Sequence, residues 1–177
     1  MLFRSMKRIN NLYEKIASPE NVMQALINAS AGKMHKPDVQ RTMSDVSKTA
    51  SSITKMLASE QFVNAPYREF TTASSGKLRL IKVVPFYPDR IVHHCIVQVM
   101  TPVWINLFIR DTYSTIPGRG IHDGALRVQQ SLRQKEETTY CLKIDIEKFY
   151  PSVNHDVLHL QNRSEERRVG KECRSRW

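Results

Sequence analysis

The sequence is poor in cysteine and contains no long hydrophobic run. It has three cysteines in 177 residues, and only Cys95 and Cys141 precede residue 163. These two form no spaced set, so we predict neither a zinc site nor a disulfide framework, and we expect both to be small buried side chains. No run approaches the ~18 apolar residues that a membrane span needs, and residues 1–8 are too charged for a signal peptide. We therefore expect a cytoplasmic protein without membrane contact.

The chain is basic, and part of this charge lies in an unusual C-terminal segment. Residues 163–177 read RSEERRVGKECRSRW, which matches an in-frame translation of a common short-read library adapter at every position. We interpret this segment as a non-native tail instead of a basic disordered one, and we exclude it from the fold. Without it, basic residues fall from 27 to 21 and acidic residues from 17 to 14, which leaves a net charge of +7. That charge suits nucleic acid, although a merely soluble basic protein would also have it.

The first 66 residues have the periodicity of helices. Apolar side chains recur at helical spacing over 6–30, with a break at Ser18, a good N-cap, followed by Pro19, which suits a first helical turn. We expect the second of these helices to end near Gly32, because glycine commonly terminates helices. A further helix is predicted over 38–59.

From residue 67 the periodicity changes to the alternation of strands. Residues 67–72 and 78–84 read as two strands joined by a turn, which predicts a hairpin over 67–84. The residues alone are also compatible with an edge hairpin that has no binding role and whose charged side chains keep it soluble.

Two helices are expected after the hairpin. The first begins at Arg90, capped by Asp89, and is apolar enough to be buried on most sides until Pro102 kinks or ends it. The second covers 121–134. Its inward-facing side chains should be Ala125, Val128 and Leu132.

A lone carboxylate, Asp145, follows the most strand-like run of the chain. Residues 140–144 read Tyr-Cys-Leu-Lys-Ile, a composition that favours a strand. A carboxylate beside such a run is costly to bury unless a cation or hydrogen bonds compensate, and Mg²⁺ prefers carboxylate oxygens. An aspartate in this place is also a common helix cap. The residues alone give the metal ligand and the cap equal weight.

The residues around Asp145 resemble the first catalytic motif of bacterial reverse transcriptases. Residues 143–158 read K-x-D-I-x-K-F-Y-P-S-V-N-H-D-x-L, which is similar to the group II intron, retron and diversity-generating retroelement enzymes. The resemblance implies that Asp145 is catalytic and binds the metal together with Ile146. It also implies that Ile146 and Tyr150 contact the nucleotide, with Tyr150 as a steric gate against a 2′-hydroxyl.

Further blocks occur in the order of the same family. The hairpin and the Pro-Phe-Tyr-Pro-Asp-Arg string after it resemble the fingers, which implies that Arg79 contacts the triphosphate. Lys77 or Lys82 would replace the second basic residue of the fingers. The string Gly118-Arg119-Gly120 resembles a loop that contacts the template or primer backbone.

A small basic turn precedes Pro37 and contains Lys33, His35 and Lys36. The family brings this region close to the template. On its residues it is a solvated loop, which is the interpretation that we favour.

We therefore predict an α+β protein comprising the fingers and the first palm strand of a right-hand polymerase fold, truncated after that strand. Its predicted parts are an N-terminal helical region (1–66), the fingers (67–139), the start of the palm (140–162) and the non-native tail (163–177). The resemblance implies an RNA-directed DNA polymerase that uses Mg²⁺, an RNA template, a DNA or RNA primer and dNTPs, with two-metal chemistry. A retroelement accessory protein is a further candidate partner.

The second acidic cluster of the family is missing, because no Asp-Asp pair occurs in the chain. We expect the chain to be inactive as it stands, with an unpaired edge on strand 140–145 and Asp145 near the surface without a second carboxylate. Residues 163–177 should make few contacts, whereas the N-terminal helices, the hairpin 67–84 and the helical region 90–109 should form a compact fingers-like unit. The alternative is a non-catalytic, basic nucleic-acid-binding module. A helical scaffold would explain neither the Gly-Arg-Gly loop nor Asp145.

Overall fold

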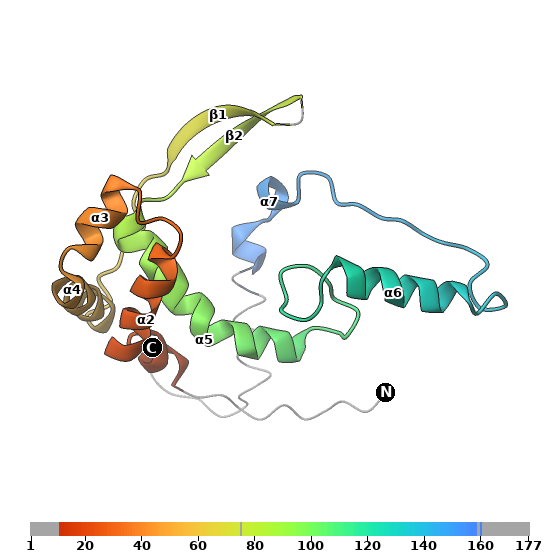
Figure 1. The fold of residues 1–177 in the computed structure, drawn as a ribbon, viewed down its shortest axis with the longest axis horizontal. Coiled ribbons are helices and arrows are strands. Elements are labelled where there is room, and N and C mark those ends of the chain that lie inside the picture. The colour runs from red at the N-terminus through yellow and green to blue at the C-terminus, as the bar shows by residue number, and fades with distance from the viewer. Residues whose placement is uncertain (1–10, 75, 159, 161–177) are drawn as a thin grey trace. The chain divides into compact units, whose positions relative to one another are not determined.

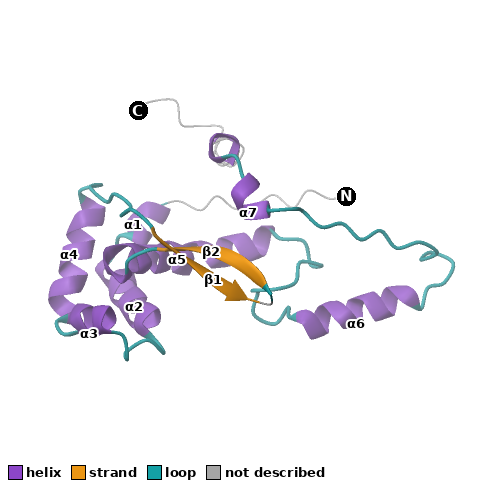
Figure 2. Ribbon diagram, turned by 90° about the horizontal axis from the view of Figure 1, so that it is seen from above, coloured by secondary structure: helices purple, strands orange, loops and turns teal. Residues whose placement is uncertain are grey.

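The computed structural model describes residues 11–74, 76–158 and 160 (Figures 1 and 2). These residues combine helices with a two-stranded antiparallel sheet, which confirms the predicted α+β class. The expectation of few contacts for the tail 163–177 falls outside the described residues. The chain divides into two compact units, one over Asn11–Ile109 and the other containing the described residues from Arg110 onward.

The unit Asn11–Ile109 contains four helices before the hairpin and one long helix after it. In chain order its elements are α1 (Leu12–Ile16), α2 (Pro19–Ser30), α3 (Pro37–Met43), α4 (Val46–Ala58), β1 (Arg68–Ser74), β2 (Lys77–Val83), the helical turn η1 (Phe86–Arg90) and α5 (Ile91–Leu107). The predicted hairpin is therefore confirmed. None of the described helices is long and apolar enough to cross a membrane.

Local capping sets the helix boundaries. The Ser18 hydroxyl accepts a hydrogen bond from the backbone N–H of Asn21 at 3.2 Å, and Pro19 opens α2, as predicted. The single helix predicted over 38–59 is wrong, because the chain forms α3 and α4 instead. The carboxylate of Asp45 accepts a hydrogen bond from the N–H of Lys48 at 2.9 Å, and this cap starts a new helix at Val46.

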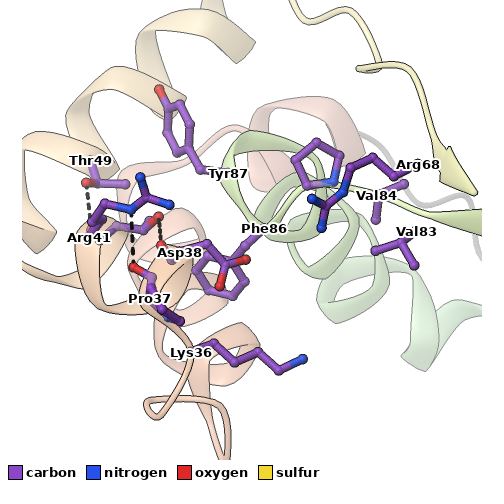
Figure 3. Close-up of a pocket in the computed structure, with 12 residues that line it drawn as sticks. Lys36, Pro37, Asp38, Arg41, Thr49, Arg68, Val83, Val84, Phe86 and Tyr87 are labelled. Carbon is purple, nitrogen blue, oxygen red and sulfur yellow. Dashed lines mark hydrogen bonds between the residues drawn. The ribbon is translucent and has the colours of Figure 1, made fainter. Parts of the chain in front are cut away.

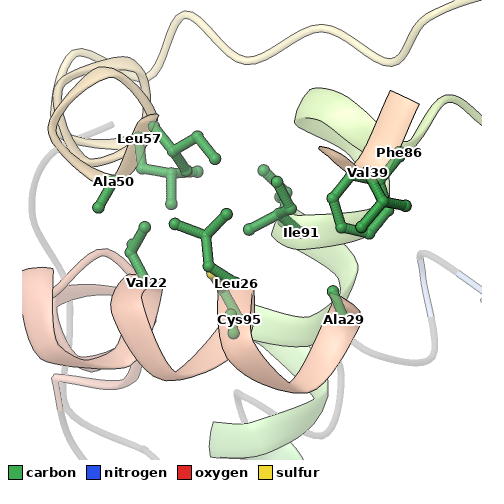
Figure 4. Close-up of a cluster of buried hydrophobic side chains, with 12 residues drawn as sticks. Val22, Leu26, Ala29, Val39, Ala50, Leu57, Phe86, Ile91 and Cys95 are labelled. Atoms are coloured by element: carbon green, nitrogen blue, oxygen red, sulfur yellow. The ribbon is translucent and has the colours of Figure 1, made fainter. Parts of the chain in front are cut away.

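The core of this unit lies where α2, α4 and α5 meet (Figure 4). Leu26, Ile53 and Ile91 are fully buried there. Phe86 from η1 and Val39 from α3 complete it, so the turn after the hairpin is anchored in the same core as the helices. Burial of the side chain stabilises the fold by about 1.5–3 kcal/mol for each of Leu26, Ile53 and Ile91.

A side-chain hydrogen-bond network ties α2 to α5. The Asn21 side-chain amide donates to the carbonyl oxygens of Ile16 (2.9 Å) and Cys95 (3.1 Å). Its oxygen accepts from the Gln98 amide at 2.8 Å, and Gln98 in turn accepts from Asn28 at 2.8 Å. Polar groups at this contact are thus paired across the two helices, which fixes their register.

Helix α5 differs from the prediction in two respects. It continues through Pro102 to Leu107, so a helix end at the proline is wrong; proline's φ suits a helix, and only one backbone hydrogen bond is lost. Burial on most sides is also wrong. Ile91, Val92 and Cys95 are buried, whereas Ile96 and Val97 in the same apolar stretch are exposed, because the core covers one side of the helix.

Cys95 is buried, as predicted, and burial raises the pKa of its thiol to about 11. Cys141 is exposed, so its predicted burial is wrong. Residues 140–146, all described, form no strand. The run has strand-forming residues, but a strand also needs a hydrogen-bonded neighbour, and the described residues supply none for it. Cys141 consequently has no sheet face on which to be buried.

The second unit contains α6 (Ile121–Leu132) and the short helix α7 (Phe149–Ser152). The prediction of a helix at 121–134 is confirmed to within two residues. The inward orientation of its apolar stripe is wrong among the described residues. Val128 is 59% exposed and Leu132 58%, and Ala125 is exposed as well, because no described element packs on this face.

Candidate functional site

The hairpin presents two of the predicted nucleotide-binding residues on one face. Arg79 pairs with Thr72 and Lys77 with Ser74 in the antiparallel register, while Gly76 supplies the positive φ of +74° at the turn. Side chains alternate along a strand, so Lys77 and Arg79 share a face with each other. Both are exposed.

Lys82 lies on the opposite face of the hairpin from Arg79. Its ammonium group forms an ion pair with the Glu69 carboxylate at 3.0 Å. Lys77, in contrast, is on the same face as Arg79 and nearer the turn. The geometry therefore favours Lys77 over Lys82 as the second basic residue beside Arg79.

A buried carboxylate joins the two ends of the hairpin. The side chain of Asp89 is fully buried, and its Oδ1 atom accepts a hydrogen bond from the backbone N–H of Ala65 at 3.0 Å. Ala65 precedes β1 and Asp89 follows β2. The predicted helix cap is thus wrong: the carboxylate makes no cap bond to α5 and instead bonds the chain entering the hairpin.

A broad groove lies beside the base of the hairpin, in the unit Asn11–Ile109 (Figure 3). Its volume is about 990 Å³. One wall comes from α3 and α4, the other from the first pair of the hairpin, Arg68 and Val83, and η1 supplies Phe86 and Tyr87. Lys36 and Arg41 line it from the α3 side and Arg68 from the hairpin side, with Asp38 as the acidic residue among the lining side chains.

A smaller hollow of about 260 Å³ adjoins this groove. Lys36, Asp38 and Phe86 line both, so the two lie side by side. The additional basic residues of the hollow are Lys33, Lys82 and Arg90. The predicted solvated loop is confirmed, because residues 31–36 form turns with Lys36 exposed, and Lys33 and Lys36 also line this concave surface.

The basic residues of the hollow affect the pKa of a neighbouring histidine, His94. Burial lowers the pKa of His94, and the charges of Lys33, Arg90 and His93 lower it further. Each of these effects disfavours the protonated imidazole. His94 therefore titrates below its ordinary range, consistent with a concentration of positive charge at this end of the groove.

The Gly118-Arg119-Gly120 string forms a tight loop in the second unit. The N–H of Arg119 donates to the Ile116 carbonyl at 3.0 Å, and the N–H of Ser114 donates to the Arg119 carbonyl at 3.1 Å. Gly118 has φ +74°, a conformation that glycine adopts without strain. Gly120 occupies the position before α6, and the Arg119 side chain is half-buried.

Ion pairs that sequence analysis did not identify brace this loop against α6. Arg110 contacts Asp123 at 3.0 Å, and Arg127 contacts Asp111 at 3.1 Å. The hydroxyl of Tyr113 donates to Asp111 at 2.9 Å, and this bond and the Arg127 bond lower the pKa of that carboxyl. The side chains of the two ion pairs are 34–62% exposed, so each pair contributes little stability and mainly fixes geometry.

A close contact with a glycine adds to this brace. The ring of Tyr113 packs tightly against position 124, because a Cβ atom there would lie 3.2 Å from its Cγ atom and the ring would have to shift slightly. Glycine at position 124 therefore allows the ring to pack closely against the first turn of α6.

Asp145, Ile146 and Tyr150 lie within six residues of one another and are all exposed. Phe149 and Tyr150 stack edge to face with their ring centroids 5.3 Å apart. Among the described residues, no group of three or more His, Cys, Asp or Glu side chains is placed to hold a metal ion. Asp145 is the described carboxylate that the resemblance assigns to the metal site, and two-metal chemistry needs further ligands besides it.

The chain is similar to a curated protein of a bacterium. The chain is 25% identical over 160 residues to Protein YkfC of Escherichia coli (strain K12). The match covers 85% of this chain and 42% of that protein, so the chain spans less than half the length of the relative. No protein-family model matches the chain.

Proposed function

We propose that the chain is the fingers and the start of the palm of an RNA-directed DNA polymerase, a reverse transcriptase. The observation that supports this best is the hairpin. It is anchored on the helical core through Phe86 and Asp89, and it carries Arg79 and Lys77 on one exposed face. Guanidinium groups pair with phosphate oxygens through two parallel hydrogen bonds, which suits the contact with a triphosphate that the resemblance implies.

The remaining residues take the roles that the resemblance gives them. Asp145 and the adjacent Ile146 contribute to the magnesium site, and Tyr150 discriminates against ribonucleotides. Arg119, with Gly118 and Gly120, contacts the template or primer backbone. The reaction is attack of a primer 3′-hydroxyl on the α-phosphate of a dNTP, with release of pyrophosphate, on an RNA template in the cytoplasm. Because the described residues supply one carboxylate to the metal site, we assign the complete activity to a longer parent.

The test is primer extension by a longer parent that contains this segment and a later acidic pair. Asp145→Asn should lower extension by about a hundredfold to a thousandfold, because loss of a metal ligand removes several kcal/mol of transition-state stabilisation. Glu136→Gln is the control, since it makes the same carboxylate-to-amide change at an exposed turn position. Undiminished extension by Asp145→Asn would rule out the assignment.

The second candidate function is a nucleic-acid-binding module without catalysis. The basic groove beside α3 favours it, because such a surface binds polyanions whether or not chemistry follows. A parent that binds RNA but never extends a primer, even with its own Asp145 intact, would support this function over the polymerase.

A further inference from the structure

Apolar and polar side chains alternate along residues 140–146. The apolar ones are 62–95% exposed, and they are Tyr140, Leu142, Ile144 and Ile146. The side chains between them are exposed as well, and they are Cys141, Lys143 and Asp145. Because successive side chains of an extended chain point to opposite sides, a strand formed here has one apolar face and one polar face. The segment therefore has the side-chain pattern of a strand but lacks a neighbouring strand.

The backbone of the same segment is unpaired. Among the described residues, no N–H or carbonyl group of 140–146 takes part in a hydrogen bond. The segment belongs to the long loop between α6 and α7 (Figure 1), and none of its residues has a positive φ. A row of free donors and acceptors beside exposed apolar side chains is a template for pairing with a strand of another chain.

The charges of the segment are complementary to those of a second copy in one antiparallel register. When Ile144 lies opposite Ile144 of the second copy, Lys143 of each copy faces Asp145 of the other. Leu142 of each copy then faces Ile146 of the other. Opposite charges that face each other across an antiparallel pair stabilise it, and so do paired apolar side chains. This register therefore matches both faces of the strand at once.

The alternative registers lose this match. A shift by two residues places either Lys143 opposite Lys143 or Asp145 opposite Asp145, and like charges in such pairs are destabilising. A shift by one residue places apolar side chains opposite polar ones. Parallel pairing in register sets both Lys143 and Asp145 beside their own counterparts. The antiparallel register centred on Ile144 is thus the one that the sequence of the segment favours.

We propose that two copies of this chain form a twofold-symmetric dimer by antiparallel pairing of residues 140–146, centred on Ile144. The same surface of both copies makes the contact, as a twofold interface requires. A two-stranded ribbon is only marginally stable by itself, so we expect weak association with a Kd on the order of 100 µM. The proposal does not rest on the polymerase function, and its failure would leave the primer-extension test unaffected.

The first test measures self-association of the full chain by sedimentation equilibrium at several concentrations up to a few times the expected Kd. Lys143→Glu should raise Kd at least about tenfold, because two attractive charge pairs of the dimer become repulsive. Lys143→Glu/Asp145→Lys exchanges the two charges and should restore Kd to within about threefold of the parent chain. Lys135→Glu is the control, since it makes the same charge reversal at an exposed turn position outside the segment.

The second test determines the register by disulfide formation under mild oxidation. The background is Cys141→Ser/Cys173→Ser, which leaves the buried Cys95. Ile144→Cys should form a disulfide-linked dimer, because directly opposed residues have their Cα atoms ~4.5–5.5 Å apart, within the range of a disulfide.

Leu142→Cys is the matched control at another apolar position of the same face. Its two copies lie ~14 Å apart in this register, so the variant alone should form no disulfide. A mixture of Leu142→Cys and Ile146→Cys should form one, because these positions face each other. The positions are exposed, and thermal unfolding by circular dichroism verifies that each variant retains the fold.

Four results would overturn the proposal. The chain could stay monomeric at every concentration, or its mass could increase without stopping at the dimer, which would indicate open-ended aggregation. Equal disulfide yields from Leu142→Cys and Ile144→Cys would exclude the register. Loss of the dimer in Leu132→Ser, with Lys143→Glu unchanged, would place the interface on the exposed apolar stripe of α6 instead.

Discussion

Asp89→Ala should loosen the base of the β1–β2 hairpin, whereas Asp89→Asn should leave it in place. Asp89 is the buried link between the segment entering β1 and the segment leaving β2, through its 3.0 Å bond to the N–H of Ala65. Its second oxygen, Oδ2, is buried without a partner among the described residues. Only the Oδ1 bond is therefore available to hold the hairpin to η1 through this side chain.

The two substitutions separate the hydrogen bond from the charge. Alanine removes the acceptor and leaves the partly buried N–H of Ala65 unpaired, which costs about 1–3 kcal/mol. Asparagine keeps an oxygen at the Oδ1 position and removes a buried charge, so its effect on the free energy of unfolding should stay within about 1 kcal/mol in either direction. The expected gap between the variants is a large part of the ~5–15 kcal/mol of a typical domain.

Hydrogen exchange and urea denaturation measure this difference. In Asp89→Ala, the amide of Ala65 should exchange about 5 to 150 times faster, the factor that corresponds to about 1–3 kcal/mol of local opening. Amides of β1 and β2 should exchange faster too, while those around Leu26 in α2 should change only with global stability. If the alanine and asparagine variants exchanged alike at Ala65, or if neither differed from the parent chain, the proposed link would be refuted.

Two further predictions concern the longer parent. Arg79→Ala should raise the dNTP concentration needed for half-maximal extension with little change in template binding, because the side chain contacts phosphates. Lys82→Ala should have a smaller effect, since Lys82 pairs with Glu69 on the other face, and an equal effect of the two would contradict the assignment. Tyr150→Ala should increase ribonucleotide incorporation relative to deoxynucleotide incorporation in a competition assay. An unchanged ratio would mean that the ring only packs against Phe149.

Several elements were predictable because their signals are local. Ser18 and Pro19 define the start of α2 through a hydrogen bond three residues along the chain, and Gly76 supplies the turn between two alternating segments. These interactions depend on the neighbouring residues and little on the rest of the fold. The same locality allowed Arg79 to be placed on the second strand of a hairpin, although that strand begins at Lys77, one residue earlier than predicted.

Other features were decided by contacts between distant parts of the chain. Strand propensity in residues 140–146 produced no strand, because pairing requires a neighbour that the described residues do not provide. Asp89 stands directly before a predicted helix, where a capping residue is expected. Its carboxylate instead accepts a hydrogen bond from the N–H of Ala65, which lies 24 residues earlier in the sequence and is brought close by the fold. The basic groove likewise exists only in three dimensions. Its charges come from Arg41 on α3 and Arg68 on β1, and packing of these elements around Phe86 brings them together.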